Sequence, residues 1–101
     1  MATLLKHPKG FLVIKMEYYE AAGLGFGIPG EGCICARCDE MIPDEIYYVP
    51  ALNDTMCPDC LTEWLKTAKW YKEDARYEQR NADFIIEQLG LHGIEPKMLD
   101  E

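Results

Sequence analysis

Two Cys-x-x-Cys pairs constrain this chain more than any other feature of its sequence. The first pair is Cys35 and Cys38, the second is Cys57 and Cys60, and residues 39–56 lie between them. Two intervening residues let both sulfurs of a pair turn toward one point about 2.3 Å from a Zn²⁺ ion, the distance that thiolates prefer. The spacing therefore predicts one structural zinc ion held by four thiolates.

Two other uses of these cysteines stay open. A disulfide framework fits less well, because the chain has 5 cysteines, an odd number, and no stretch typical of a secretory signal. The other alternative is a thiol redox protein. Cys57-Pro58-Asp59-Cys60 precedes a predicted helix, as in the active sites of thioredoxins and glutaredoxins, where the helix N-terminus lowers a thiol pKa. Those folds need a βαβ framework, which this sequence does not indicate.

The length and charge of the chain limit what it can be. With 101 residues it forms one domain with a modest core, so a bound metal should contribute much of its stability. We expect the metal-free protein to be at least partly unfolded. No apolar run is long enough for a membrane span, which predicts a cytoplasmic protein. A net charge of −8 would repel free nucleic acid overall.

The chain divides into three segments. Residues 1–32 are expected to form an N-terminal strand over Phe11–Tyr19 and a glycine-rich loop over Glu20–Gly32, both packed on the metal site. Residues 33–71 hold the cysteine pairs, a hairpin and the start of a helix. Residues 72–101 should form a C-terminal helix followed by a loose acidic tail.

Local signals predict the hairpin and the helices. A strand over Glu45–Leu52 is followed by the turn pair Asn53-Asp54 and a short return strand. Pro58 suits the first turn of a helix, and helical spacing of apolar residues then continues to a stop at Gly90. One long helix or two helices with a bend near residues 71–74 would both fit, and we favour the bend.

A cysteine knuckle, a hairpin and a helix that begins at the second cysteine pair resemble a treble-clef zinc finger with LIM-like or GATA-like spacing. The resemblance covers residues 33 to about 70. It implies that Cys35 and Cys38 are the knuckle ligands and that Cys57 and Cys60 are the ligands at the helix start. The expected fold class is a small metal-stabilised α+β domain. Treble clefs bind nucleic acids, dock proteins and occur in a few enzymes, so the resemblance leaves the function open.

Cys33 is the one cysteine outside the two pairs. It is expected to be a packed or exposed thiol, although it could replace Cys35 as a ligand or be reactive.

Four thiolate ligands argue against a catalytic zinc ion. A catalytic zinc keeps one coordination position open for water, whereas four thiolates fill the shell. We therefore expect no enzymatic activity.

Two surfaces are candidates for binding another protein. Three aromatic residues recur every seven positions, and the hairpin begins with two acids; these candidate contacts are Trp70, Tyr77, Phe84, Asp44 and Glu45. They predict a protein-interaction module, an adaptor or inhibitor of the kind found in bacteria or phages. The aromatic face could also be covered within the chain, by the N-terminal strand or the hairpin, or by a second copy of the chain bound through the C-terminal helix.

The runner-up function is nucleic-acid binding by a regulatory zinc finger. Basic residues recur every three or four positions and would form one stripe on a continuous helix: Lys66, Lys69, Lys72, Arg76 and Arg80. Acids placed three residues before Lys66 and Arg76 give a simpler explanation, a solvated face of helical ion pairs.

Overall fold

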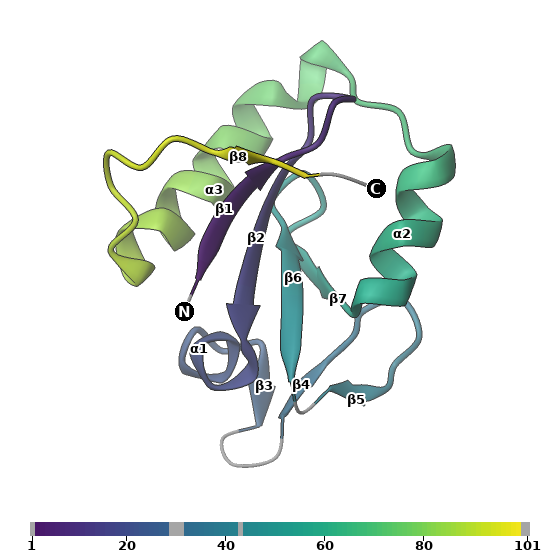
Figure 1. Cartoon of the computed structure of the whole chain (residues 1–101), viewed down its shortest axis with the longest axis vertical. Coiled ribbons are helices and arrows are strands. Elements are labelled where there is room, and N and C mark those ends of the chain that lie inside the picture. The colour runs from purple at the N-terminus through teal and green to yellow at the C-terminus, as the bar shows by residue number, and fades with distance from the viewer. Residues whose placement is uncertain (1, 29–31, 43, 100–101) are drawn as a thin grey trace.

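A five-stranded sheet forms the centre of the protein in this computed structural model, which describes residues 2–28, 32–42 and 44–99. Neighbouring strands are antiparallel, except that β8 runs parallel to β1. The order across the sheet is β7 (Asp54–Met56), β6 (Glu45–Val49), β2 (Leu12–Glu17), β1 (Thr3–Lys6) and β8 (Lys97–Met98) (Figure 1). The protein is thus a small α+β domain, as expected.

The N-terminal hairpin lies in the middle of this sheet and does not merely cover the metal site. In β1 and β2, Leu4 pairs with Ile14 and Leu5 with Val13, so that adjacent pairs point to opposite faces. All four side chains are buried, which requires a cover on both faces. The strand expected over Phe11–Tyr19 is shorter in the structure: β2 covers Leu12–Glu17, because Tyr18 already begins a helix.

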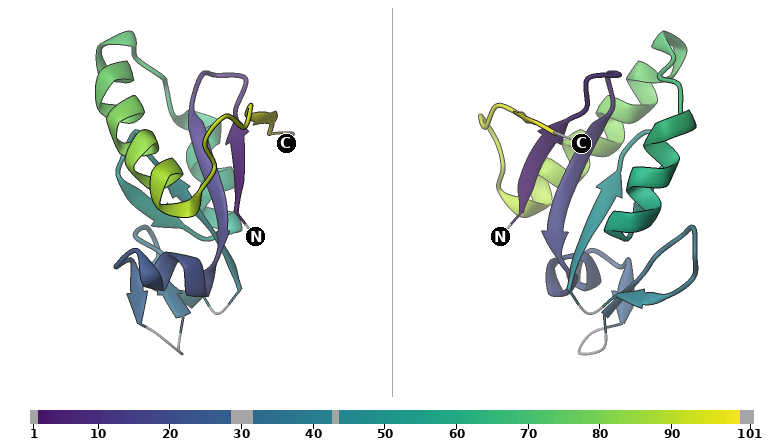
Figure 2. Two further views of the ribbon diagram at one scale, coloured as in Figure 1. Left: turned by 90° about the vertical axis from the view of Figure 1, so that its left-hand side faces the viewer. Right: turned by 45° about the vertical axis from the view of Figure 1, so that its right-hand side comes forward.

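Two helices supply the two covers, on opposite faces of the sheet (Figure 2). Leu61 and Leu65 of α2 (Pro58–Thr67) pack with Leu5 and Val13 in one apolar cluster. On the other face, Ile85 of α3 (Ala75–Leu89) packs in a second apolar cluster around the opposite side of β1 and β2. We call these the α2-side and α3-side clusters.

The chain bends between the two helices. Ala68 ends α2 in an extended conformation, and a short 3₁₀ turn, η1 (Lys72–Asp74), leads into α3. Asp74 occupies the N-cap position of α3, but its side chain makes no capping hydrogen bond. Gly90 ends α3 at φ 70°, a left-handed conformation that glycine adopts without strain. None of the helices in the described ranges has the length and apolarity needed to cross a membrane.

The glycine-rich stretch is more ordered than expected. It contains α1 (Tyr18–Gly23) and β3 (Gly27–Ile28), and β3 joins β4 (Gly32–Ile34) and β5 (Met41–Ile42) in a second sheet. A capping box between Glu17 and Glu20 begins α1. A Cβ on Gly27 would lie 2.4 Å from the carbonyl oxygen of Gly32, so glycine here permits close strand pairing. The expected loop is wrong for these parts, and residues 29–31 lie outside the described residues.

The expectation of a loose C-terminal tail is also wrong up to Leu99. β8 pairs with β1, and the backbone N–H of Leu99 donates to the carbonyl oxygen of Lys6 at 2.9 Å. The Leu99 side chain packs against the α2-side cluster. Backbone pairing and apolar contact together hold this segment on the sheet. Residues 100–101 lie outside the described part of the chain.

Candidate metal centre

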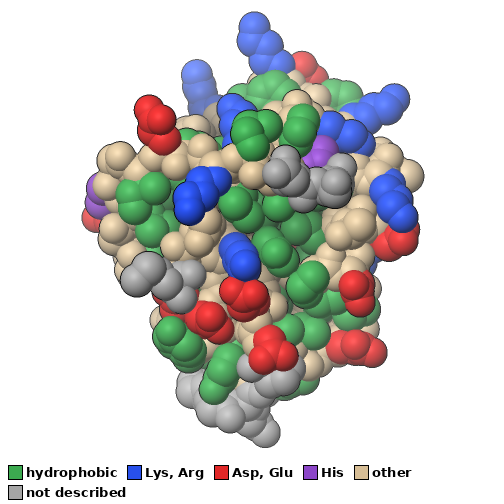
Figure 3. Space-filling view, viewed as in Figure 1, with side chains coloured by type: hydrophobic (Ala, Val, Ile, Leu, Met, Phe, Trp, Pro, Cys, Tyr) green, Lys and Arg blue, Asp and Glu red, His purple; other side chains and the backbone are tan. Residues whose placement is uncertain are grey.

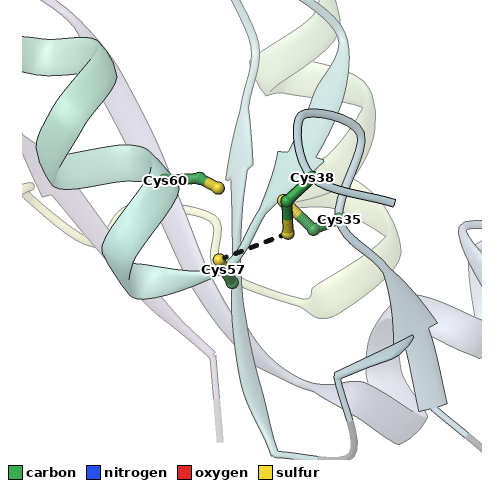
Figure 4. A group of neighbouring side chains, drawn as sticks. All are labelled: Cys35, Cys38, Cys57 and Cys60. Atoms are coloured by element: carbon green, nitrogen blue, oxygen red, sulfur yellow. Dashed lines mark hydrogen bonds between the residues drawn. The ribbon is translucent and has the colours of Figure 1, made fainter. Parts of the chain in front are cut away.

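Four cysteines from two structural elements meet beside the α2-side cluster (Figure 4). Cys35 and Cys38 lie in the turn between β4 and β5, while Cys57 is the N-cap of α2 and Cys60 lies in its first turn. Their sulfur atoms all lie within 4.8 Å of one another, and those of Cys38 and Cys57 are 4.0 Å apart. We call these four residues the cysteine cluster.

The spacing of these sulfurs suits a tetrahedral metal ion. With metal–sulfur bonds of 2.3 Å, a tetrahedron has edges of about 3.8 Å, close to the 4.0 Å between the sulfurs of Cys38 and Cys57. A disulfide bond would need about 2.05 Å, and all five cysteines of the chain are free. Four thiolates are a donor set that favours zinc and other thiophilic metals. The residues present therefore fit one metal ion with a full shell of sulfur ligands.

A tight knuckle holds the first cysteine pair. The backbone N–H of Asp39 donates to the carbonyl oxygen of Cys35 at 2.9 Å, and the N–H of Cys35 donates to that of Glu40 at 3.0 Å. These bonds reverse the chain within a few residues. Asp39 consequently takes φ 61°, a left-handed conformation in which glycine is more common.

Electrostatics favours negative charge on one sulfur of the metal-free cluster. Burial raises the pKa of the Cys35 thiol, but the backbone N–H groups of Cys38, Cys57 and Arg37 outweigh this effect and lower the pKa to about 7. In contrast, the neighbouring Cys57 thiol and burial raise the pKa of Cys60 well above its usual range. Crowded thiols resist ionising together. A divalent cation would offset that repulsion, and the N-terminus of α2 adds favourable positive potential.

The hairpin of β6 and β7 connects the knuckle to α2. The backbone N–H of Ala36 donates to the carbonyl oxygen of Thr55 at 2.8 Å, and the Thr55 hydroxyl donates to the carbonyl oxygen of Ile34 at 3.0 Å. Thr55 lies in β7, two residues before Cys57. The two cysteine pairs are thus brought together by the backbone even before any ligand bond is considered.

Cys33 lies apart from the cysteine cluster. Its side chain is 0% exposed, belongs to the α3-side cluster, and its thiol donates to the carbonyl oxygen of Phe26 at 3.1 Å. Burial raises the pKa of the Cys33 thiol. Its surroundings are those of a packed core thiol, the first of the alternatives suggested by the sequence.

The three aromatic candidates do not share one helical face. Tyr77 and Phe84 are exposed on α3, but Trp70 lies before that helix and is half-buried. The Trp70 indole packs against the α2-side cluster, and its Nε1–H donates to Glu78 Oε1 at 3.2 Å. The seven-residue spacing did not place the three side chains on one face, because that inference requires a continuous helix. Trp70 is therefore covered by packing within the chain, one of the alternatives open from the sequence, and this corrects its assignment as a candidate partner contact.

The acidic and basic candidates are also separated by the fold. Asp44 is exposed, whereas Glu45 forms an ion pair with Lys15 at 3.3 Å. Lys66 on α2 pairs with Glu63 at 3.2 Å. The basic residues do not form the stripe that a continuous helix would give. They occupy three different elements and the connection before α3: Lys66 in α2, Lys69 in the connection, Lys72 in η1, and Arg76 and Arg80 in α3.

Glu78 is an important buried residue that the sequence prediction missed. It is 4% exposed, and its carboxylate accepts hydrogen bonds from the Leu12 backbone N–H at 3.0 Å and from Trp70. One sequence signal was available. Glu78 lies three residues after Ala75 and four before Ala82, on the apolar stripe of α3, where an acid needs a buried partner.

Comparisons with protein-family models, curated proteins and solved structures found no significant match for this chain. The chemistry of the site therefore follows from the geometry of its own residues.

Proposed function

We propose that the protein is a zinc-stabilised protein-interaction module of the treble-clef type. The cysteine cluster would hold one Zn²⁺ ion. The order of elements supports this assignment: β4 and β5 flank the knuckle, β6 and β7 form the following hairpin, and α2 begins at the second cysteine pair. Such an ion would fix two hairpins and a helix relative to one another.

The observation that carries the proposal is the closed set of four sulfurs. All of them lie within 4.8 Å of one another, so a tetrahedral ion bound there has no free position for water or substrate. A metal in that state stabilises structure and does not activate a nucleophile. The function is then recognition by the surface around the site rather than turnover.

An acidic surface near the cysteine cluster would meet the partner. Asp39, Glu40 and Asp44 are exposed on or just after the knuckle, and no basic residue lies between positions 39 and 56. On the face shown in Figure 3, most acidic side chains lie in the middle and lower part and most basic ones in the upper part. A metal-fixed knuckle presents its charges with little loss of conformational freedom, which favours binding of a basic protein surface.

Affinity capture from the native host with the zinc-loaded protein tests this function. We expect one specific partner, lost when Asp44→Lys and Glu45→Lys are combined and when Cys57→Ser removes the metal. The matched control combines Glu87→Lys and Glu95→Lys, which reverse two exposed acids elsewhere. Equal recovery of the partner by all variants would contradict the proposed surface, and recovery of nucleic acid alone would favour the runner-up function.

A further inference from the structure

A groove beside α3 is not used by the proposed metal site or by the acidic surface. Its volume is about 440 Å³, and it is lined by Phe26, Asn53, Arg80, Asn81, Phe84 and Ile85. A smaller hollow of about 300 Å³ is lined by Glu73, Arg76, Tyr77 and Arg80. Arg80 lines both hollows, so they adjoin at this side chain, and we call the two together the Arg80 groove. Its size is within the usual range for binding sites.

Two aromatic rings on this surface are only partly covered by the described residues. Tyr77 is 42% exposed and Phe84 is 59% exposed. They lie seven residues apart on α3, so both project from the same side of the helix. Tyrosine, phenylalanine and arginine are enriched where proteins bind one another, and grouped exposed aromatics mark such sites. The composition of the groove is thus that of a protein-binding surface.

The arginines of the groove have unused hydrogen-bonding capacity. The Arg80 guanidinium carbon lies 5.5 Å from the centre of the Tyr77 ring, which orients it beside the groove. Within the described residues, neither Arg76 nor Arg80 has a carboxylate at ion-pair distance. The nearby Asp83 carboxylate instead accepts a hydrogen bond from Gln79 at 2.8 Å. Guanidinium groups are matched best by carboxylates, which can bind both nitrogens at once.

We infer that the Arg80 groove binds an acidic segment of another protein. The segment places an aromatic or large aliphatic side chain against Phe84 and carboxylates on Arg76 and Arg80. This inference rests on the proposed function as an interaction module and adds the chemistry of one partner. A nucleic acid fits less well, because the chain carries a net charge of −8 and the groove offers two arginines beside Glu73. Acidic and basic docking surfaces on one small domain suit an adaptor that joins two proteins.

Selection of peptides against the zinc-loaded protein tests the inference. A random peptide library displayed on phage is selected on the wild-type protein, and the enriched peptides are labelled with fluorescein for anisotropy titrations. We expect peptides in which acids flank an aromatic or large aliphatic residue. Arg80→Glu and Phe84→Ala should each weaken their binding at least about tenfold, as hot-spot residues do.

Matched variants control for charge and for exposed apolar area. Lys97→Glu reverses an exposed cation on β8, and Met98→Ala removes a side chain that is 60% exposed, close to the value for Phe84. Both should leave peptide affinity unchanged within about twofold, since they lie outside the groove. Zinc content and circular dichroism verify that every variant is folded.

Several outcomes would overturn the inference. These are the absence of enriched peptides, enrichment of basic peptides, and equal loss of affinity in the control variants. Binding of single-stranded oligothymidylate that Arg80→Glu abolishes would assign the groove to nucleic acid instead. If no peptide binds the Arg80 groove but capture of the partner still depends on Asp44 and Glu45, the inference is wrong and the proposed function stands. Loss of that capture together with intact peptide binding would move recognition to the Arg80 groove alone.

Discussion

The Glu78 carboxylate joins α3 to the central sheet and to the connection before the helix. It accepts hydrogen bonds from Leu12 in β2 and from the Trp70 indole. Glu78→Ala should lower the free energy of unfolding by about 3 kcal/mol, because two donors lose their acceptor. Glu87→Ala, at an exposed position on the same helix, should change it by less than about 0.5 kcal/mol. Urea denaturation of the zinc-loaded variants measures both, and similar values for the two would contradict the role given to Glu78.

The left-handed conformation of Asp39 gives a second prediction about a single residue. Asp39→Gly should preserve or raise the free energy of unfolding, since glycine adopts φ 61° without strain. Asp39→Val should lower it by about 1–2 kcal/mol, because a β-branched residue resists this conformation. Glu40→Val introduces the same side chain at the next exposed position, outside the left-handed region. Denaturation midpoints that fall equally for both valine variants would show that the strain is not at Asp39.

Trp70 lies in the connection between α2 and α3 and packs against the α2-side cluster. A Cβ on Gly10 would lie 3.0 Å from Trp70 Cδ2, so the indole lies directly against the β1–β2 turn. Trp70→Ala should therefore lower the free energy of unfolding by about 2–3 kcal/mol, somewhat less than for a fully buried tryptophan. Tyr71→Ala, at the exposed neighbouring position, is the control. A stable Trp70→Ala protein with weakened partner binding would instead restore the surface role suggested by the sequence.

Elements with strong local signals could be predicted from the sequence. Asn53 marks the hairpin of β6 and β7, Pro58 the start of α2, and Gly90 the end of α3. The bounds of the hairpin differ from the prediction, because β6 ends at Val49 rather than Leu52 and Asp54 already begins β7. The convergence of the cysteine cluster followed from the spacing within each pair. All of these depend on residues close together in the chain.

Elements that depend on distant partners were not predictable in the same way. β1 and β8 are short, and their pairing joins the two ends of the chain, so no local pattern marks them. The capping box of Glu17 and Glu20 was readable, but it lacks the usual serine or threonine. The Arg80 groove could not be predicted, because it also needs Phe26 and Asn53, which are far from α3 in the sequence.

At the scale of the whole molecule, the described residues form two apolar clusters with different relations to the metal site. The α2-side cluster includes three of the four proposed ligands: Cys35, Cys57 and the half-buried Cys60. The cysteine of the α3-side cluster is Cys33, which is not a proposed ligand. Metal removal should therefore loosen α2 and the knuckle first. Hydrogen exchange after chelation should rise more in residues 33–42 and 58–67 than in residues 75–89. A uniform rise would indicate that both clusters depend equally on the metal, and no change would show that the fold does not need it.

The central claim is that four thiolates hold one metal ion in the folded protein. Native mass spectrometry of protein purified under reducing conditions tests it most directly, with Cys60→Ser and Cys33→Ser measured alongside. We predict one zinc ion per wild-type chain, none in Cys60→Ser and one in Cys33→Ser. Cys60 belongs to the cysteine cluster, whereas Cys33 does not. A folded wild-type chain without metal, or a metal lost equally from Cys33→Ser, would contradict the account.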